Sequence, residues 1–206
     1  MARVLAQKGY YEKVKPLLER NLQALETLAK KYDTDVVDNV YDAMIEERRV
    51  LVNPVQISAE EQLRKWNSEV YELYLKYQEN LKYETEKGEM VRSKSEVIIA
   101  NILHQHRKYL LYKYERPLEV SIAGKKQIIH PDFTILNLRT GKLMYWEHAG
   151  RMDDVRYVND FVQKMNVYAE NNLFPGEDVI VTYETMNLPL NIHMVKVQVN
   201  RLIKTS

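Results

Sequence analysis

Two acidic residues, Asp132 and Glu147, are the strongest candidates for chemistry. Each of them ends an apolar run, and a turn sequence, Arg139-Thr140-Gly141, lies between the two runs. If the turn is centred between Arg139 and Thr140, the two acids lie opposite each other on neighbouring antiparallel strands. Opposed side chains have Cβ atoms about 4.5–5.5 Å apart, so two like charges there repel. Unless the register differs, one acid must be protonated or a cation must lie between them. Binding of a divalent metal ion would explain why two acids are placed together.

A third acid, Glu96, belongs to a helix that the sequence predicts to begin after Ser93. It shares a helix face with Ile99, Ala100 and Leu103, and an acid on an apolar face needs a partner. The alternative is structural: Glu96 stands three residues after Ser93, the spacing of a capping box.

The order of predicted elements divides the chain into a helical region, residues 1–90, and a second region, residues 91–206. In the first region apolar residues recur at steps of three and four: Val14, Leu18, Leu22, Leu25 and Leu28. Ser58 and Glu61 form a capping-box pattern that opens a further helix, whose apolar period is close to 3.5 residues. Such a period permits a coiled-coil seam, and with it a homo-oligomer, or an ordinary bundle face.

The second region predicts an α/β fold with a mixed sheet. After the helix at Ser93 come a strand over residues 110–120, the two strands of the hairpin, a helix from Asp153 and a strand over 179–183. Asn191 is placed to cap a closing helix.

The composition indicates a soluble protein, which we expect in the cytoplasm. The 206 residues are 45% hydrophobic and 29% charged, with no cysteine, so disulfides and thiolate metal sites are excluded. The first residues lack the apolar core of a signal peptide, and no window approaches the roughly 20 apolar residues of a membrane span. We therefore expect no membrane partner.

The net charge of +1 hides an uneven distribution, since residues 91–206 carry 16 Lys and Arg against 12 Asp and Glu. Most of the excess lies between Arg92 and Lys126, as a phosphate backbone would require. The candidates for nucleic-acid contact are Arg92, Lys94, Lys113 and Arg116. A solvated basic surface is the alternative.

Three motifs in order, Arg92-Ser93-Lys94-Ser95-Glu96, His130-Pro131-Asp132-Phe133 and Tyr145-Trp146-Glu147-His148-Ala149-Gly150, resemble the core of the PD-(D/E)XK nuclease superfamily over residues 91–203. They look most like a group of uncharacterised bacterial members with a helical N-terminal extension and a Glu-His-x-Gly variant of the last motif. The resemblance implies a restriction-endonuclease-like core that hydrolyses phosphodiester bonds, most often of DNA. It also implies Mg²⁺ or Mn²⁺ held by Asp132 and Glu147, with Glu96 completing the site.

The chain departs from the superfamily pattern two residues after Glu147, where Ala149 replaces the usual catalytic lysine. Some lineages carry this lysine on the following helix, and Lys164, or Gln163 beside it, is placed to act in that way if the helix packs across the hairpin. His148 ranks lower as a substitute, because alternation along a strand points it to the opposite face of the sheet.

Each assignment has a structural alternative. Asp132 after Pro131 is also typical of a strand-end turn, Glu147 could pair with Arg151, and Lys164 could be an ordinary solvated lysine. Taken together, these alternatives describe a catalytically inactive nuclease-fold protein that binds nucleic acid or a protein partner. Ala149 is the feature that favours it.

Overall fold

The computed structural model describes residues 2–32, 36, 40–41, 43–49, 51–52, 59–72, 79 and 81–204. The chain divides into two compact units, Met1–Ser58 and Ala59–Ser206. This division falls at residue 58, whereas the predicted helical region runs to residue 90. Helix α4 (Ala59–Ser68) belongs to the second unit because Trp66 is buried and Glu69, just after the helix, pairs with Lys113.

The first unit contains α1 (Ala2–Lys31) and the short α3 (Glu46–Arg49). The apolar residues predicted to share a helix all lie on α1, which has Pro16 within it and no buried residue. The next predicted helical stripe falls partly outside the described residues. None of the described helices is both long and apolar enough to cross a membrane.

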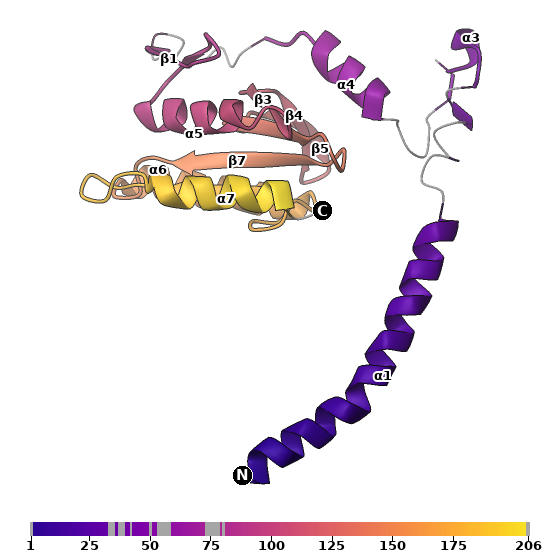
Figure 1. Ribbon diagram of the computed structural model, residues 1–206. Coiled ribbons are helices and arrows are strands. Elements are labelled where there is room, and N and C mark those ends of the chain that lie inside the picture. The colour runs from indigo at the N-terminus through magenta and orange to yellow at the C-terminus, as the bar shows by residue number, and fades with distance from the viewer. Residues whose placement is uncertain are drawn as a thin grey trace. The chain divides into compact units, whose positions relative to one another are not determined.

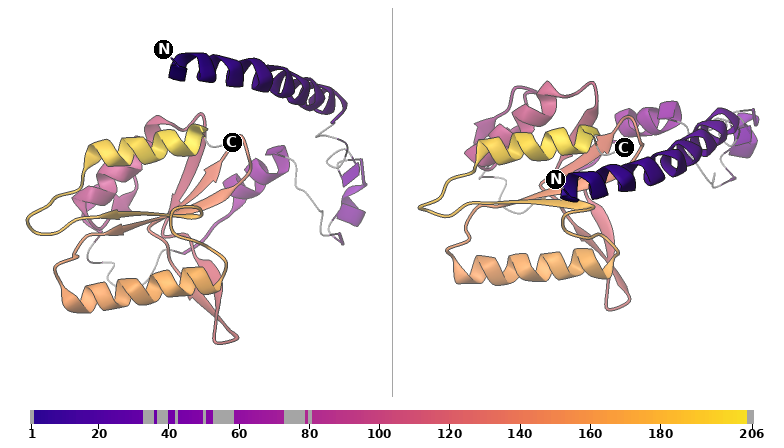
Figure 2. Two further views of the ribbon diagram at one scale, coloured as in Figure 1. Left: turned by 90° about the horizontal axis from the view of Figure 1, so that it is seen from below. Right: turned by 60° about the horizontal axis from the view of Figure 1, so that its bottom comes forward.

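The second unit is a four-stranded mixed sheet covered by helices on both faces (Figures 1 and 2). The strands, in spatial order, are β3 (Leu110–Tyr114), β6 (Phe133–Asn137), β7 (Leu143–Ala149) and β8 (Val179–Tyr183). The helices are α5 (Lys94–Gln105) and α7 (Ile192–Lys204) on one face and α6 (Val155–Glu170) on the other. The pairs β3–β6 and β6–β7 are antiparallel, whereas β7 and β8 are parallel. The predicted α/β class with a mixed sheet is confirmed.

The register of the hairpin is the predicted one. Phe133 pairs with Trp146 and Thr134 pairs with Tyr145. Continued by one step, this register sets Asp132, just before β6, opposite Glu147 of β7.

The single strand predicted over residues 110–120 is wrong, because the chain breaks at Glu115. This residue has a positive φ of 46°, and Pro117 follows it. Strands β4 (Leu118–Ile122) and β5 (Lys125–Ile129) form a separate antiparallel hairpin that leads back to Asp132. Strands β1 (Tyr83–Glu84) and β2 (Met90–Val91) also pair, within a stretch predicted to be helical.

The predicted starts of three helices are confirmed. Ser93 accepts a hydrogen bond from the Glu96 amide at the start of α5, and Asp154 caps α6 through its side chain. Asn191 caps α7 in the same way. Of the predicted capping box at α4, Ser58 lies outside the described residues. These caps fix where the two helices that carry Glu96 and Lys164 begin.

Candidate active site

Glu96 and Lys164 gather around the paired acids at the end of β7 from which α6 departs. Asp132 acts electrostatically on Glu96, Glu147 and Lys164, so the four groups form one cluster. The backbone amide of His148 donates to Asp132 Oδ2 at 2.6 Å, which fixes one carboxylate oxygen. The structure thus brings together all four of the predicted catalytic residues, each from a different element or connection.

Glu147 and Lys164 form a buried ion pair. Lys164 Nζ lies 2.7 Å from Glu147 Oε1 and 2.8 Å from Oε2, and it also donates to the His130 carbonyl at 2.9 Å. The Glu147 side chain is 4% exposed and that of Lys164 is 29% exposed. Two alternatives are therefore wrong: Lys164 is not an ordinary solvated lysine, and Arg151 pairs with Asp154 rather than with Glu147.

Burial and neighbouring charge set the protonation of this pair. Burial, helped by the negative charge of Asp132, raises the pKa of Glu147 to about 7, although Lys164 opposes the shift. Burial also disfavours the charge on Lys164, but Glu147 and Asp132 outweigh it and raise the pKa of Lys164. Lys164 is therefore a cation, and Glu147 can gain or lose a proton near neutral pH.

Tyr168, on the same helix as Lys164, donates its hydroxyl to Glu147 Oε1. Burial and the adjacent carboxylate raise the pKa of Tyr168, so the hydroxyl stays a donor. The sequence placed this residue only within the helix predicted to begin at Asp153. Its position four residues after Lys164 was the available signal, because residues four apart share a helix face.

Glu96 is held at the start of α5 by two donors. The Arg92 amide and the Tyr114 hydroxyl each donate to Glu96 Oε2 at 2.8 Å. Burial and the charge of Asp132 raise the pKa of Glu96. Glu96 therefore contributes to the start of the helix, through the Arg92 amide rather than the Ser93 amide, and the same carboxylate senses the charge of Asp132.

A second ion pair, missed by the sequence reasoning, borders the cluster. Arg92 Nε lies 2.9 Å from Glu115 Oε1, and Arg92 Nη2 donates to Oε2 at 3.1 Å. The amide of Glu115 bonds to the carbonyl of Asp132, and burial raises the pKa of Glu115 despite Arg92. The positive φ of Glu115 turns the chain at this point. The two residues are 23 positions apart, so no local pattern indicated the pair.

The cluster contains three carboxylates, which are hard oxygen donors. The hydrogen bonds described above reach Oδ2 of Asp132 and Oε2 of Glu96, whereas Glu147 has both oxygens bonded to Lys164. Within the described part of the chain, no three His, Asp or Glu side chains form a group that could hold a metal ion as they stand. The donor types fit Mg²⁺ or Mn²⁺.

His148 faces away from the cluster, as predicted. Its Nδ1 lies 3.1 Å from Thr182 Oγ1 and its Nε2 lies 3.3 Å from Glu184 Oε1. Ser95 donates to the other Glu184 oxygen at 2.7 Å. This network ties the end of β7 to the residues after β8 and to α5, so His148 has a structural role.

The predicted nucleic-acid contacts separate into two groups. Lys113 and Arg116 both bond to Glu69 and pack near Trp66, and the Lys113 side chain is only 11% exposed. The contacts of Lys113 and Arg116 with Glu69 and Trp66 therefore give these two residues a structural role. Arg92 is likewise paired, with Glu115, and its side chain is 18% exposed. Lys94 is exposed beside Glu96 and is the strongest candidate of the four.

Comparison with protein-family models and with curated protein sequences finds no match to this chain.

The raised pKa of Glu147 predicts a pH-dependent stability. A carboxyl whose pKa is about 7 when folded and about 4.5 when unfolded favours folding below pH 4.5, and this contribution is lost as the pH rises to about 7. We expect the free energy of unfolding of the wild type, relative to Glu147→Gln, to fall across this range by at most about 3 kcal/mol. Chemical denaturation at a series of pH values measures it. Parallel profiles for the two proteins would contradict the assigned shift.

Proposed function

We propose that this protein is a metal-dependent nuclease of the PD-(D/E)XK superfamily that hydrolyses phosphodiester bonds of DNA. The observation that carries the proposal is the position of Lys164, whose amine bonds Glu147 beside Asp132. Alanine occupies position 149, where the superfamily usually has a lysine, and Lys164 supplies a positive charge to the same cluster instead. The order of helix, strands and acids along residues 91–203 supports the same assignment.

Mg²⁺ or Mn²⁺ would be held by Asp132 and Glu147, with Glu96 as the third acid. When bound, the metal would supply Lewis-acid activation of water and stabilise charge at the phosphate. Burial raises the pKa of Glu96 and Glu147, and the negative charge of Asp132 adds to both shifts. A divalent cation among these acids would relieve that unfavourable charge.

Lys164 would orient the attacking water and stabilise the negative charge that develops on the phosphate. An amine that stays charged next to two carboxylates is suited to the second role. Tyr168 and the His130 carbonyl hold Glu147 and Lys164 in place, so little rearrangement of the pair is needed.

The second candidate is a nuclease-fold protein that binds nucleic acid or a protein partner without cutting. The observation that favours it is the pairing of both Glu147 oxygens with Lys164, which leaves fewer open ligands for a metal. The two candidates share the fold and differ only in whether the cluster performs chemistry.

The deciding experiment incubates labelled single-stranded, double-stranded and branched DNA with the full chain and Mg²⁺, Mn²⁺ or EDTA. The enzyme proposal expects cleavage of at least one substrate with metal and none with EDTA, and loss of cleavage in Asp132→Ala purified identically. Equal cleavage by wild type and Asp132→Ala would indicate contamination and overturn the proposal. DNA binding without cutting would favour the second candidate.

A further inference from the structure

Helix α1 carries a long row of exposed apolar side chains. It has 30 residues, none of them buried. Apolar side chains repeat every three and four residues along one stripe and are mostly more than half exposed: Val4, Tyr11, Val14, Leu18, Leu25 and Leu28. An isolated helix gains most of its stability from packing an amphipathic face, so this stripe needs a partner.

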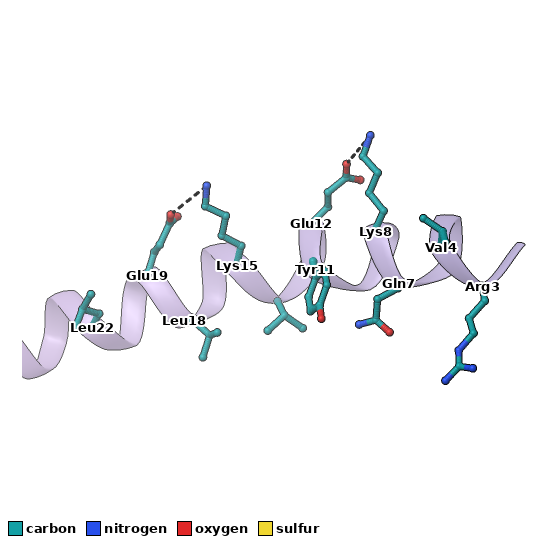
Figure 3. Close-up of a pocket in the computed structure, with 11 residues that line it drawn as sticks. Arg3, Val4, Gln7, Lys8, Tyr11, Glu12, Lys15, Leu18, Glu19 and Leu22 are labelled. Carbon is teal, nitrogen blue, oxygen red and sulfur yellow. Dashed lines mark ion pairs between the residues drawn. The ribbon is translucent and has the colours of Figure 1, made fainter. Parts of the chain in front are cut away.

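The stripe follows the a and d positions of a coiled coil over four heptads. Val4, Tyr11, Leu18 and Leu25 are seven residues apart and occupy one position, whereas Gln7, Val14, Asn21 and Leu28 occupy the other. Figure 3 shows Gln7, Tyr11 and Leu18 on one side of α1 and the pairs Lys8–Glu12 and Lys15–Glu19 on the other. The charged groups thus leave the stripe open.

We propose that α1 binds α1 of a second copy of this chain as a parallel, in-register coiled coil. The two polar residues on the stripe, Gln7 and Asn21, favour a second copy of α1 as the partner and a parallel orientation of the two helices. In a parallel pair Asn21 meets Asn21 and Gln7 meets Gln7, and each amide offers both a donor and an acceptor to its equivalent. In an antiparallel coiled coil the a positions face d positions, so the register that overlaps all four heptads would set Asn21 against Tyr11 and Gln7 against Leu25, leaving buried amides without matching partners.

The flanking positions are compatible with this pairing. In a parallel dimer the flanking contacts are Leu17 with Leu22 and Ala24 with Ala29, which widen the apolar seam. Among the flanking contacts of this dimer, only that of Arg3 on one helix with Lys8 on the other brings like charges together. Lys8 already pairs with Glu12 of its own helix at 3.9 Å.

The size of the seam is sufficient for a dimer. If each of the six apolar stripe residues loses about 100 Å², two helices together bury roughly 1,200 Å², the lower end of the range for stable interfaces. Pro16 lies at the position farthest from the seam, where its ring bends the helix without entering the interface. Its missing backbone donor therefore costs the seam nothing.

The mass of the full chain in solution tests the dimer without reference to nuclease activity. Sedimentation velocity at micromolar concentration should give twice the 24.5 kDa chain mass, and Leu18→Asp combined with Leu25→Asp should give the single-chain mass. Leu5→Asp is the matched control, because Leu5 is 64% exposed, like Leu18 at 61% and Leu25 at 63%, but lies off the stripe. A monomeric wild type, or equal dissociation by the control, would overturn the proposal.

Cross-linking tests the direction, because the chain has no native cysteine. In a parallel pair, Leu25→Cys places the two thiols opposite each other, within the ~4.4–6.8 Å between Cα atoms that a disulfide requires. In the antiparallel pair they lie about 27 Å apart along the axis, and Leu25→Cys instead meets Gln7→Cys. We expect efficient oxidation of Leu25→Cys alone. Cross-linking only in the mixture with Gln7→Cys would overturn the parallel arrangement.

Discussion

Replacing Lys164 by methionine is expected to lower metal-dependent DNA cleavage by about 10²–10⁴-fold, the range typical of losing a positioned proton-transfer or charge-stabilising group. It should also lower the free energy of unfolding, because Glu147 is buried and loses its cation. We expect a cost of about 2–4 kcal/mol, below the full value for a buried pair because Lys164 is partly exposed and Glu147 can take up a proton. Single-turnover cleavage and chemical denaturation measure the two effects.

The matched control for this prediction is Gln163→Met, which changes the neighbouring, exposed residue on the same helix. It should leave both quantities unchanged within about 0.5 kcal/mol and a few-fold in rate. Adding Glu147→Gln to Lys164→Met should recover most of the stability, since no buried charge is then left unpaired, but none of the cleavage. Wild-type cleavage by Lys164→Met would show that the lysine has only a structural role.

Replacing Asp132 by asparagine is expected to reduce the affinity for Mn²⁺ by at least about 100-fold while the fold is kept. The asparagine Oδ1 can accept the hydrogen bond from the His148 amide as the carboxylate does. Removing the charge also relieves repulsion on Glu96 and Glu147, both of which Asp132 drives toward protonation. Calorimetric titration with Mn²⁺ and thermal unfolding measure the two effects.

Asp160→Asn is the control, because Asp160 is an exposed acid on α6 outside the cluster. It should bind Mn²⁺ as the wild type does. If Asp132→Asn kept the wild-type affinity, Asp132 would not be a metal ligand and the proposed site would be wrong.

Local signals were sufficient for much of the site. The turn at residues 139–141 and the flanking apolar runs predicted the register, and the observed pairs from Phe133 to Leu136 confirm it. Ser93, Asp154 and Asn191 were recognisable caps, because a capping side chain acts on residues two or three positions away. Lys164 was found by asking which cation could replace the missing one at Ala149.

The remaining site residues depend on contacts that no short pattern contains. Tyr114 and Tyr168 were predicted only as members of a strand and a helix. Both residues are buried, and their hydroxyls bond Glu96 and Glu147. The Arg92–Glu115 pair joins residues distant in sequence across the cluster. Such partners are set by the packing of α5 and α6 against the sheet ends.

Two errors had signals that were present and underweighted. Pro117 is poorly suited to the middle of a strand, and with Glu115 it ends β3. Ala123 and Gly124, both with positive φ, form the tight turn between β4 and β5. Recognising this turn would have predicted the second hairpin, which lies between β3 and Asp132 in sequence.

The most direct test of the central claim is the single-turnover rate of cleavage of labelled DNA by the wild type in Mg²⁺, beside Asp132→Asn and Asp160→Asn prepared in the same way. The account predicts cleavage by the wild type and Asp160→Asn that EDTA abolishes, and a rate at least about 10³-fold lower for Asp132→Asn. No cleavage of any DNA by the folded wild type with Mg²⁺ or Mn²⁺, or an equal rate in all three proteins, would contradict it.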